Sequence, residues 1–434
     1  MQIRPARGDE IEEIAQLWCD AFPGDRTVED RSRMLEEGGP YGGVETVLVA
    51  READGTLAAA CKIYRLTQHV TGVPAPMMGL AAVAVRPSRR RRGVGRVLCT
   101  EALRAAAERG DVLSALYPFR PDYYRRMGWE LVGALHEYRL RTHHLPDYAE
   151  ADAVREALGT ADAEALAACY ARAAERGHGP IRRDRRIWAY RLTGMEIGVR
   201  PLDVDGSLDL GRHPLRRTLV FQADQVRGYA LVQYAPAASP EEGTLLVREL
   251  IAETEAAYRG LIGHLRAQAD QWPYIRHFAR PQERLEERLR DPRPPRFRPA
   301  RSLYFPTARI LRGPMLRLVD LPAALRLRRW FDAPGAENES LTFRIEMEDP
   351  DLPHNRGPWR VRIEGAAATV EPAGDAAPVE AALTAGAAPL ARIYAGELTV
   401  SDALRTGLAE VRGEPAALDR AFGAREPFWL LDEF

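Results

Sequence analysis

Residues 1–145 alternate between short apolar runs and amphipathic stretches. Apolar side chains recur at helical spacing from Ile11 to Trp18. The run 45–70 alternates as two strands on either side of the turn dipeptide Asp54-Gly55. The pattern therefore predicts an α/β domain over 1–145. In chain order its expected elements are strand 2–6, helix 11–18, helix 27–39, the hairpin 45–70, strand 77–87, helix 93–110, strand 112–118, helix 121–128 and strand 130–140.

Residues 146–300 begin again with a helical stretch, 157–177. A hairpin over 218–235 follows, and residues 244–272 then repeat the strand-then-helix pattern of the first domain. The turn in this repeat holds Ala252-Glu253-Thr254-Glu255, where the first domain has glycines. The pattern predicts a second, degenerate copy of the first domain.

The last stretch, 301–434, follows a segment rich in Pro and Arg that cannot form regular helix or interior strand. Its strands precede most of its helices, which predicts an α+β domain. The chain ends on PFWLLDEF, whose apolar side chains indicate a docked tail. The expected strands are 341–349, 359–365 and 366–374, and the expected helices are 377–396, 399–411 and 414–422.

Composition narrows the function classes. A chain of 434 residues with 46% apolar residues is large enough for two or three cores. The net charge of -1 argues against a protein that binds nucleic acid or anionic lipid through its overall field, and Lys62 is the only lysine. Four scattered cysteines, no apolar run of membrane-spanning length and no signal-peptide pattern favour a cytoplasmic protein. The pair His143-His144 lacks further ligands at metal spacing, so no metal site is predicted.

The segment PSRRRRGVGR, residues 87–96, admits two interpretations. Its arginines are compatible with a nucleic-acid patch, which would bind in a strongly salt-dependent way. Its Arg90-x-x-Gly93-x-Gly95 lies between an apolar strand and a helix, where free N–H groups and the helix dipole favour a phosphate. A dinucleotide loop is disfavoured because the third glycine of that fingerprint is missing. The phosphate interpretation is preferred because of this strand-turn-helix context.

The element order, this loop and the segment Tyr124-x-x-Met-Gly-Trp together resemble the GCN5-related N-acetyltransferase fold. The resemblance implies that coenzyme A is held along the strand Val83-Ala84-Val85 by its pantetheine arm and at the loop by its pyrophosphate. Phe119 and Arg120 are placed to touch the same cofactor. The loop residues expected to bind it are Arg90, Arg91, Arg92, Gly93, Val94, Gly95 and Arg96.

Tyr124 stands at the general-acid position of that family. A phenol with an ordinary pKa of about 10 is protonated at neutral pH and can give its proton to the departing thiolate. The alternative is a core aromatic side chain of an amphipathic helix. Tyr123 is the neighbouring candidate and is expected to pack.

The whole chain resembles the enhanced-intracellular-survival (Eis-like) family of N-acetyltransferases. The resemblance implies three parts: an acetyltransferase domain over 1–145, a degenerate one over 146–300, and a sterol-carrier-like domain over 301–434. It also implies that the carboxylate of Phe434 enters the active site as general base.

Further expectations carried by this resemblance concern the partners. Acetyl-CoA is the co-substrate, and the acceptor is a primary amine of an aminoglycoside, a polyamine or a lysine side chain. Asp25 and Glu433 are candidate ligands of that amine, with a solvated surface carboxylate as the alternative for each. A homo-oligomer, a hexamer in the family, is expected. The rival hypothesis is a lipid or sterol carrier that uses the last domain.

Overall fold

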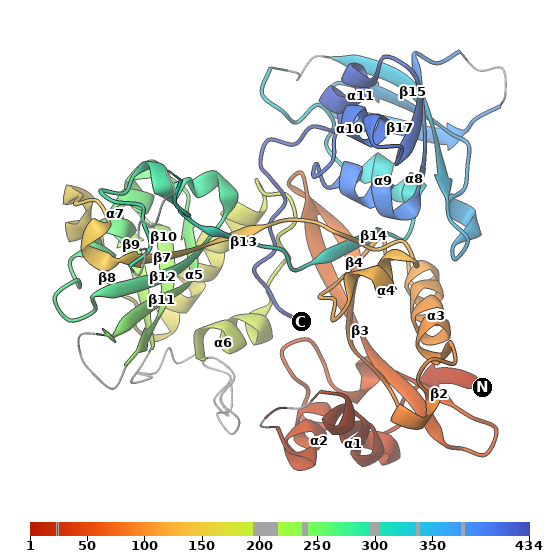
Figure 1. The fold of residues 1–434 in the computed structure, drawn as a ribbon, viewed down its shortest axis with the longest axis horizontal. Helices are drawn as coiled ribbons and strands as arrows, with labels where there is room; N and C mark the ends of the chain where they lie inside the picture. The colour runs from red at the N-terminus through yellow and green to blue at the C-terminus, as the bar shows by residue number, and fades with distance from the viewer. Residues whose placement is uncertain are drawn as a thin grey trace. The chain divides into compact units, whose positions relative to one another are not determined.

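The fold is described from a computed structural model of the chain (Figure 1). Its contacts divide the chain into two compact units. The first unit comprises Met1–Gly133, Gly177–Arg182 and Gly313–Phe434, and the second comprises Ala134–Arg176 and Arg183–Arg312. The residues described are 1–22, 24, 26–193, 216–236, 242–295, 304–335, 339–374 and 378–434. No helix in these ranges is long and apolar enough to cross a membrane.

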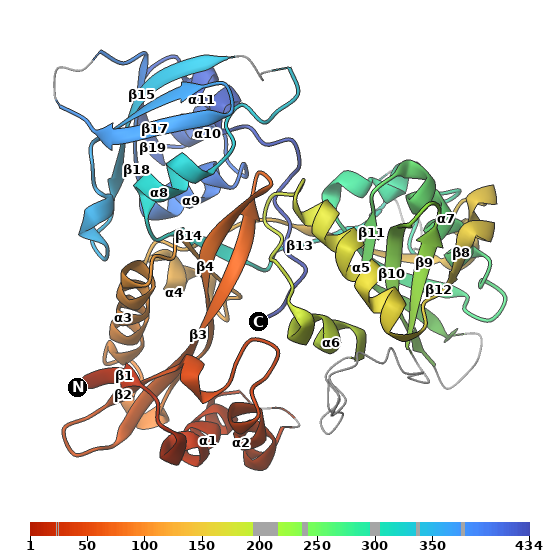
Figure 2. The ribbon, with the colours of Figure 1, turned by 180° about the vertical axis from the view of Figure 1, so that it is seen from behind.

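The first unit contains a seven-stranded sheet in the order β1-β2-β3-β4-β5-β14-β6. The helices α1 and α2 pack on one face and α3 and α4 on the other (Figures 1 and 2), so two separate apolar cores form. The strands are β1 Gln2–Pro5, β2 Val47–Arg51, β3 Leu57–Val70, β4 Val73–Val85, β5 Leu113–Leu116, β6 Glu130–Leu131 and β14 Met315–Leu318. The helices are α1 Ile11–Ala21, α2 Val28–Glu36, α3 Val94–Glu108 and α4 Pro121–Arg125.

One strand of this sheet comes from far along the chain. β14 pairs antiparallel with β5, through Met315 opposite Leu116, and with β6, through Met315 opposite Leu131. The sequence placed this stretch at the start of the last domain, whereas the structure places it inside the first sheet. The single strand expected over 130–140 is also corrected, because it divides into β6 in the first unit and β7, Leu135–Arg141, in the second.

The rest of the first unit is a five-stranded sheet, β17-β16-β15-β18-β19, with four helices. Rings of Trp330, Phe343 and Phe422 pack on one another in its core, with centroids 5.0–6.0 Å apart. The strands are β15 Ser340–Glu348, β16 Trp359–Glu364, β17 Ala367–Pro372, β18 Ala381–Gly386 and β19 Ala409–Gly413. The helices are α8 Leu321–Leu327, α9 Ala387–Tyr394, α10 Val400–Arg405 and α11 Pro415–Phe422.

The helix expected over 377–396 is partly wrong. Residues 381–386 form β18, in which Ala381, Leu383 and Ala385 are buried and the residues between them are half-buried. β18 pairs in parallel with β15 along its whole length. This pairing overrides the helix propensity of the alanine-rich sequence, and the helix α9 begins only at Ala387.

The second unit contains its own seven-stranded sheet, β13-β7-β12-β11-β10-β9-β8. β11 is followed directly by α7, which confirms the strand-then-helix pattern expected over 244–272. The strands are β7 Leu135–Arg141, β8 Val154–Glu156, β9 Arg216–Gln222, β10 Val226–Ala235, β11 Thr244–Ala252, β12 Tyr274–Ala279 and β13 Arg309–Leu311. The helices are α5 Gly159–Ala174, α6 Arg185–Thr193 and α7 Glu255–Arg266.

Candidate active site

The turn between β4 and α3 leaves a row of backbone donors open. Arg91 and Gly93 both have positive φ, 62° and 79°, which turns the chain sharply into the helix. Among the described residues, no acceptor bonds the N–H groups of residues 91–96, and the helix has no side-chain cap. Unpaired N–H groups at a helix N-terminus attract an anion. The turn is therefore built as an anion site.

Positions 93 and 95 of this turn require glycine for different reasons. A Cβ at Gly93 would meet nothing within 4 Å, so this glycine supplies the left-handed backbone. A Cβ at Gly95 would lie 2.6 Å from the Oη of Tyr123 and 3.2 Å from Val85. Gly95 thus lets the first turn of α3 pack closely onto α4 and β4.

The arginines of the segment do not form one patch. Arg89 pairs with Glu52 at 2.6 Å, and the Nε of Arg90 donates to the carbonyl of Val85 at 3.2 Å. Arg96 reaches Asp351, which precedes α9 in the chain, at 3.2 Å. Arg91 and Arg92 are exposed. The fixed geometry of the segment therefore lies in its backbone rather than in its charges.

Beside this turn, β4 and β5 part. They pair in parallel only through Met77, Met78 and Gly79, although β4 continues to Val85. Ala82 has a φ of 49°, the register with β3 shifts there, and its carbonyl accepts a hydrogen bond from the indole of Trp18 at 2.8 Å. Consequently none of the described strands pairs with the backbone of 80–85 on its β5 side, and Val83 and Val85 are half-buried.

Tyr124 lies on α4 with 3% of its surface exposed. Its ring is 5.0 Å from that of Tyr123, 5.7 Å from Phe119 and 6.1 Å from Trp129. Burial raises the pKa of Tyr124 well above its ordinary value, and the neighbouring Cys99 adds to this shift. The phenol is therefore protonated throughout the physiological range and can donate a proton.

The C-terminal tail ends beside β4. The N–H of Trp429 donates to the carbonyl of His178 at 2.9 Å, and the Oη of Tyr117 donates to the carbonyl of Asp432 at 3.0 Å. The ring of Phe434 lies 5.8 Å from Tyr117 and 6.0 Å from Tyr41. A Cβ at Gly79 would come within 2.9 Å of this ring. Phe434 is thus seated where β4 and β5 part.

The other predicted residues lie as follows. Phe119 is exposed and stacks on the two tyrosines, whereas Arg120 pairs with Asp122 at 3.1 Å. Glu433 is exposed beside Phe434, and Asp25 lies outside the described residues. The described residues contain no group of three or more His, Cys, Asp or Glu that could hold a metal ion.

Sequence reasoning missed several side chains of this region. Gly79, Tyr41 and Tyr117, which surround Phe434, belong to no local motif, and only the fold brings them together. Asp351 was missed as well, since it contacts α3 across 251 residues of sequence. An ion-pair pattern at this separation carries no signal in a single sequence.

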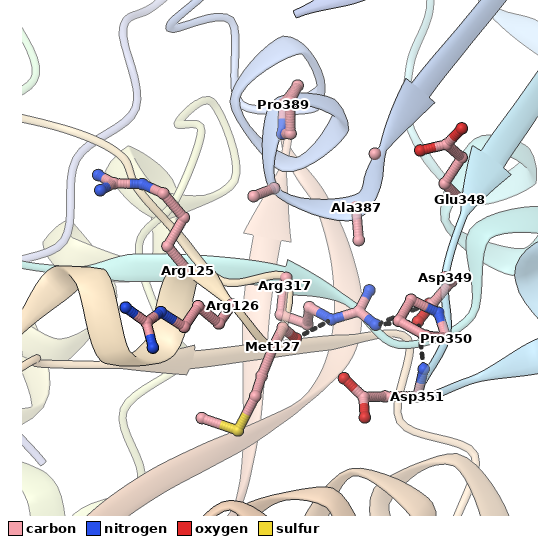
Figure 3. Close-up of a pocket in the computed structure, with 13 residues that line it drawn as sticks. Arg125, Arg126, Met127, Arg317, Glu348, Asp349, Pro350, Asp351, Ala387 and Pro389 are labelled. Atoms are coloured by element: carbon pink, nitrogen blue, oxygen red, sulfur yellow. Dashed lines mark hydrogen bonds and ion pairs between the residues drawn. The ribbon is translucent and has the colours of Figure 1, made fainter.

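A cavity of about 200 Å³ lies next to α4 (Figure 3). The buried Arg317 of β14 crosses its wall, donates to the carbonyl of Met127 at 3.0 Å and pairs with both oxygens of Asp349 at 2.7 Å. A Cβ at Gly128 would lie 2.5 Å from the Nε of Arg317, which explains the glycine of the Tyr-x-x-Met-Gly-Trp segment. Arg317 therefore connects β14 to Met127, just after α4, the helix that carries Tyr124.

Comparison with protein-family models gives three matches. Residues 2–132 match an acetyltransferase (GNAT) domain, residues 179–318 match a second acetyltransferase (GNAT) domain, and residues 321–430 match a sterol carrier protein domain. These matches confirm the predicted combination of two acetyltransferase-type folds and a sterol-carrier-like fold. The predicted residue boundaries near 145 and 300 stay predictions.

Curated proteins and solved structures agree with these matches. The chain is 27% identical over 368 residues to the N-acetyltransferase Eis of Mycobacterium tuberculosis, which covers 83% of this chain and 81% of that protein. It is also 27% identical to an uncharacterized N-acetyltransferase of Streptomyces griseus, over 84% of this chain and 83% of the other.

Two solved structures share the fold over 100% of both chains. A GCN5-related N-acetyltransferase from Anabaena variabilis matches with a TM-score of 0.78 at 20% identity. Eis1 from Mycobacterium abscessus matches with a TM-score of 0.75 at 22% identity.

Proposed function

Because this chain is an N-acetyltransferase of the Eis-like, GCN5-related family, we propose that it transfers the acetyl group of acetyl-CoA to a primary amine. Tyr124 acts as the general acid and the carboxylate of Phe434 as the general base. One observation carries the proposal. An open helix N-terminus, a gap between two parallel strands and the end of a docked tail meet at β4.

The proposed acetyl-CoA site follows the chain from the turn to the gap. The N–H groups of residues 91–96 bind the pyrophosphate, and the exposed Arg91 and Arg92 add a favourable potential for its phosphates. The pantetheine arm lies along Val83, Ala84 and Val85, where its amides take the place of the missing strand. Phe119, which precedes α4 and contacts Tyr124, is proposed to touch the same arm.

The proposed reaction is a direct transfer. The neutral amine attacks the thioester carbonyl carbon, a C–N bond forms, and the C–S bond breaks. The Phe434 carboxylate accepts the proton that the amine nitrogen loses, and Tyr124 gives its proton to the departing CoA thiolate. Tyr124 then regains a proton from solvent, and the Phe434 carboxyl group releases its proton to solvent. The raised pKa of Tyr124 means that the phenol is protonated before each turnover, as this role requires, and it also makes the phenol a weaker acid.

The acceptor is proposed from the resemblance to be a cationic amine of the aminoglycoside, polyamine or lysine type, with Asp25 and Glu433 as candidate ligands. A cytoplasmic homohexamer is proposed on the same ground. Light scattering of the purified protein tests the oligomer, and an acetyl-CoA consumption screen against a panel of amines tests the acceptor class. The lipid-carrier alternative rests on the sterol-carrier match alone, and aromatic rings fill the core of that domain.

Two variants test the proposed chemistry. Tyr124→Phe is expected to lower kcat by about 100-fold or more, because proton transfer contributes that much, while acetyl-CoA affinity by calorimetry stays close to wild type. Removal of Phe434 is expected to do the same. Tyr123→Phe is the matched control, with the same change one residue away, and should retain turnover. Wild-type rates in both test variants would refute the assigned roles.

A further inference from the structure

The only lysine of the chain lies on the sheet face that carries Phe434. Lys62 is on β3 opposite Ala81, and Tyr64, two residues on, is opposite Gly79. Because side chains alternate along a strand, Lys62 and Tyr64 point to the same face. Gly79 is the residue against which the Phe434 ring packs. Ala81, opposite Lys62, and Gly79, against which Phe434 packs, are two residues apart along β4, a spacing of about 7 Å.

Lys62 is a buried cation that forms no ion pair with any of the described residues. Its side chain is 7% exposed, and its Nζ lies 5.2 Å from the ring centre of Trp18 and 5.7 Å from that of Tyr64. Neither a hydrogen bond nor an ion pair joins this ammonium to the described residues. Aromatic faces stabilise a cation, but a nearly buried charge ordinarily also has an anionic partner.

The surrounding charges do not supply that partner. Among the described side chains, the carboxylate of Glu45 acts on Lys62 with the opposite charge, and its Oε1 accepts a hydrogen bond from the N–H of Gly43 at 2.8 Å. Arg26 and Arg31 act on Lys62 with the same charge. The Nε of Arg31 is buried without a hydrogen-bond partner. The local field therefore favours an anion from outside the protein.

A row of rings connects this cation to the end of the tail. Tyr64 is 5.3 Å from Tyr41, and Tyr41 is 6.0 Å from Phe434. These apolar rings could contact the short methylene chain of a small ligand that spans the interval between Lys62 and Phe434. One end of such a ligand would meet the Phe434 carboxylate and the other the Lys62 ammonium.

We propose that Lys62 binds a carboxylate of the acceptor, so that the preferred acceptor is a small primary amine that also carries a carboxylate, such as a free amino acid with an amino-terminated side chain. This inference rests on the proposed function. The amine end lies at Phe434, where it is deprotonated and acetylated, and the carboxylate end lies at Lys62. Polyamines lack the second group and meet a like charge at that position.

Pairs of amines that differ only by a carboxylate test the inference. Release of CoA thiol from acetyl-CoA is measured with lysine against 1,5-diaminopentane, and with ornithine against 1,4-diaminobutane. In the wild type, kcat/KM for each amino acid is expected to exceed that of its decarboxylated partner by about tenfold or more, the size of one charge-assisted hydrogen bond. In Lys62→Met this ratio is expected to fall to about one. Thermal unfolding and the KM for acetyl-CoA check that the variant is folded.

A second measurement keeps the test independent of that variant. Burial lowers the pKa of Lys62 to about 8, Glu45 opposes this shift, and Arg26 and Arg31 add to it. Because the neutral amine cannot attract a carboxylate, the kcat/KM ratio should decline toward one as the pH rises through about 8. Lys62→Arg keeps its charge in this range and should retain the ratio.

The outcomes are distinguishable. Acetylation of the amines with a ratio that does not respond to Lys62→Met, or a wild-type preference for the diamines, overturns the inference and leaves the proposed function standing. If none of the four amines is acetylated but other amines are, the inference alone is overturned. If no amine of a wider panel is acetylated either, both the inference and the proposed function are overturned.

Discussion

In each acetyltransferase-type sheet a central strand is followed by a helix, β4 by α3 and β11 by α7. The two turns differ in whether the N–H groups at the start of the helix are hydrogen-bonded. Between β4 and α3 the turn spans residues 86–93, and the donors at the start of the helix are left open. Between β11 and α7 it spans only 253–254. There the Oγ1 of Thr254 accepts a hydrogen bond from the N–H of Ala257 at 3.1 Å. The second helix is capped by its own chain.

The second turn also contains its own anion. The buried carboxylate of Glu253 lies 2.6 Å from Arg172 and 3.6 Å from Arg227. Burial alone would raise the pKa of Glu253, but hydrogen bonds from Arg172 and Cys169 outweigh it and hold the pKa below its usual range. A fixed negative charge thus lies in the turn before α7, whereas the turn before α3 contains no acidic residue. The contrast is between a helix terminus that the chain itself caps and one whose N–H groups stay available to a ligand.

The largest effect, on acetyl-CoA affinity, is expected from placing a fixed negative charge in the open turn before α3, as Glu253 does in the second turn. Gly93→Asp places a carboxylate among the free N–H groups, and Asp tolerates the left-handed backbone at this position. Acetyl-CoA affinity, measured by calorimetry, is expected to fall about 100-fold or more through loss of charge-assisted hydrogen bonds and like-charge repulsion. Gly93→Asn, with the same shape and no charge, should lose much less. Equal affinities for the two variants would argue against a phosphate at this turn.

An intermediate effect, on the KM for acetyl-CoA, is expected from removing Asp351, which contacts the first turns of α3. Asp351 accepts from Arg96 at 3.2 Å and from the hydroxyl of Thr100 at 3.3 Å, and so fixes the first turns of α3. Asp351→Ala is expected to raise the KM for acetyl-CoA about fivefold, since partly exposed ion pairs contribute about 1 kcal/mol, with little change in kcat. Asp351→Asn, which retains one acceptor oxygen, should be milder. A parallel fall in kcat would instead indicate a disturbed Tyr124.

The smallest effect is expected at the capped turn. Thr254→Ala removes the side-chain cap of α7 and should destabilise the second unit by about 1 kcal/mol, seen as a lower midpoint in calorimetric unfolding. Thr254→Ser keeps the hydroxyl and should behave as wild type. Acetyl-CoA affinity should be the same in all three proteins, and a loss in Thr254→Ala would mean that the second turn takes part in cofactor binding.

Sequence periodicity predicted the helices and strands that are determined by residues close to one another in the chain. The hairpin at Asp54-Gly55, the helix after Gly93 and the strand-then-helix pattern over 244–272 all form as expected. It failed where the partner is distant. Residues 381–386 became a strand because β15 pairs with them, and β14 joined the first sheet beside strands almost 200 positions earlier in the chain.

The residues of the candidate site fall into the same two groups, those close together in the sequence and those that only the fold brings together. The open turn and Tyr124 could be named from sequence, because a strand, two glycines and one aromatic motif lie within about 40 residues of each other. The surroundings of Phe434 could not. Gly79, Tyr41 and Tyr117 reach it only after the tail has docked on His178, and no spacing rule relates residues so far apart.

The position of β14 also bears on how the chain is made. A ribosome releases β5 some 200 residues before the strand that covers its edge, so the sheet holding the open turn remains unfinished during most of translation. An uncovered strand edge is a template for aggregation. A fragment expressed from residues 1–145 alone would lack β14 and keep that edge bare.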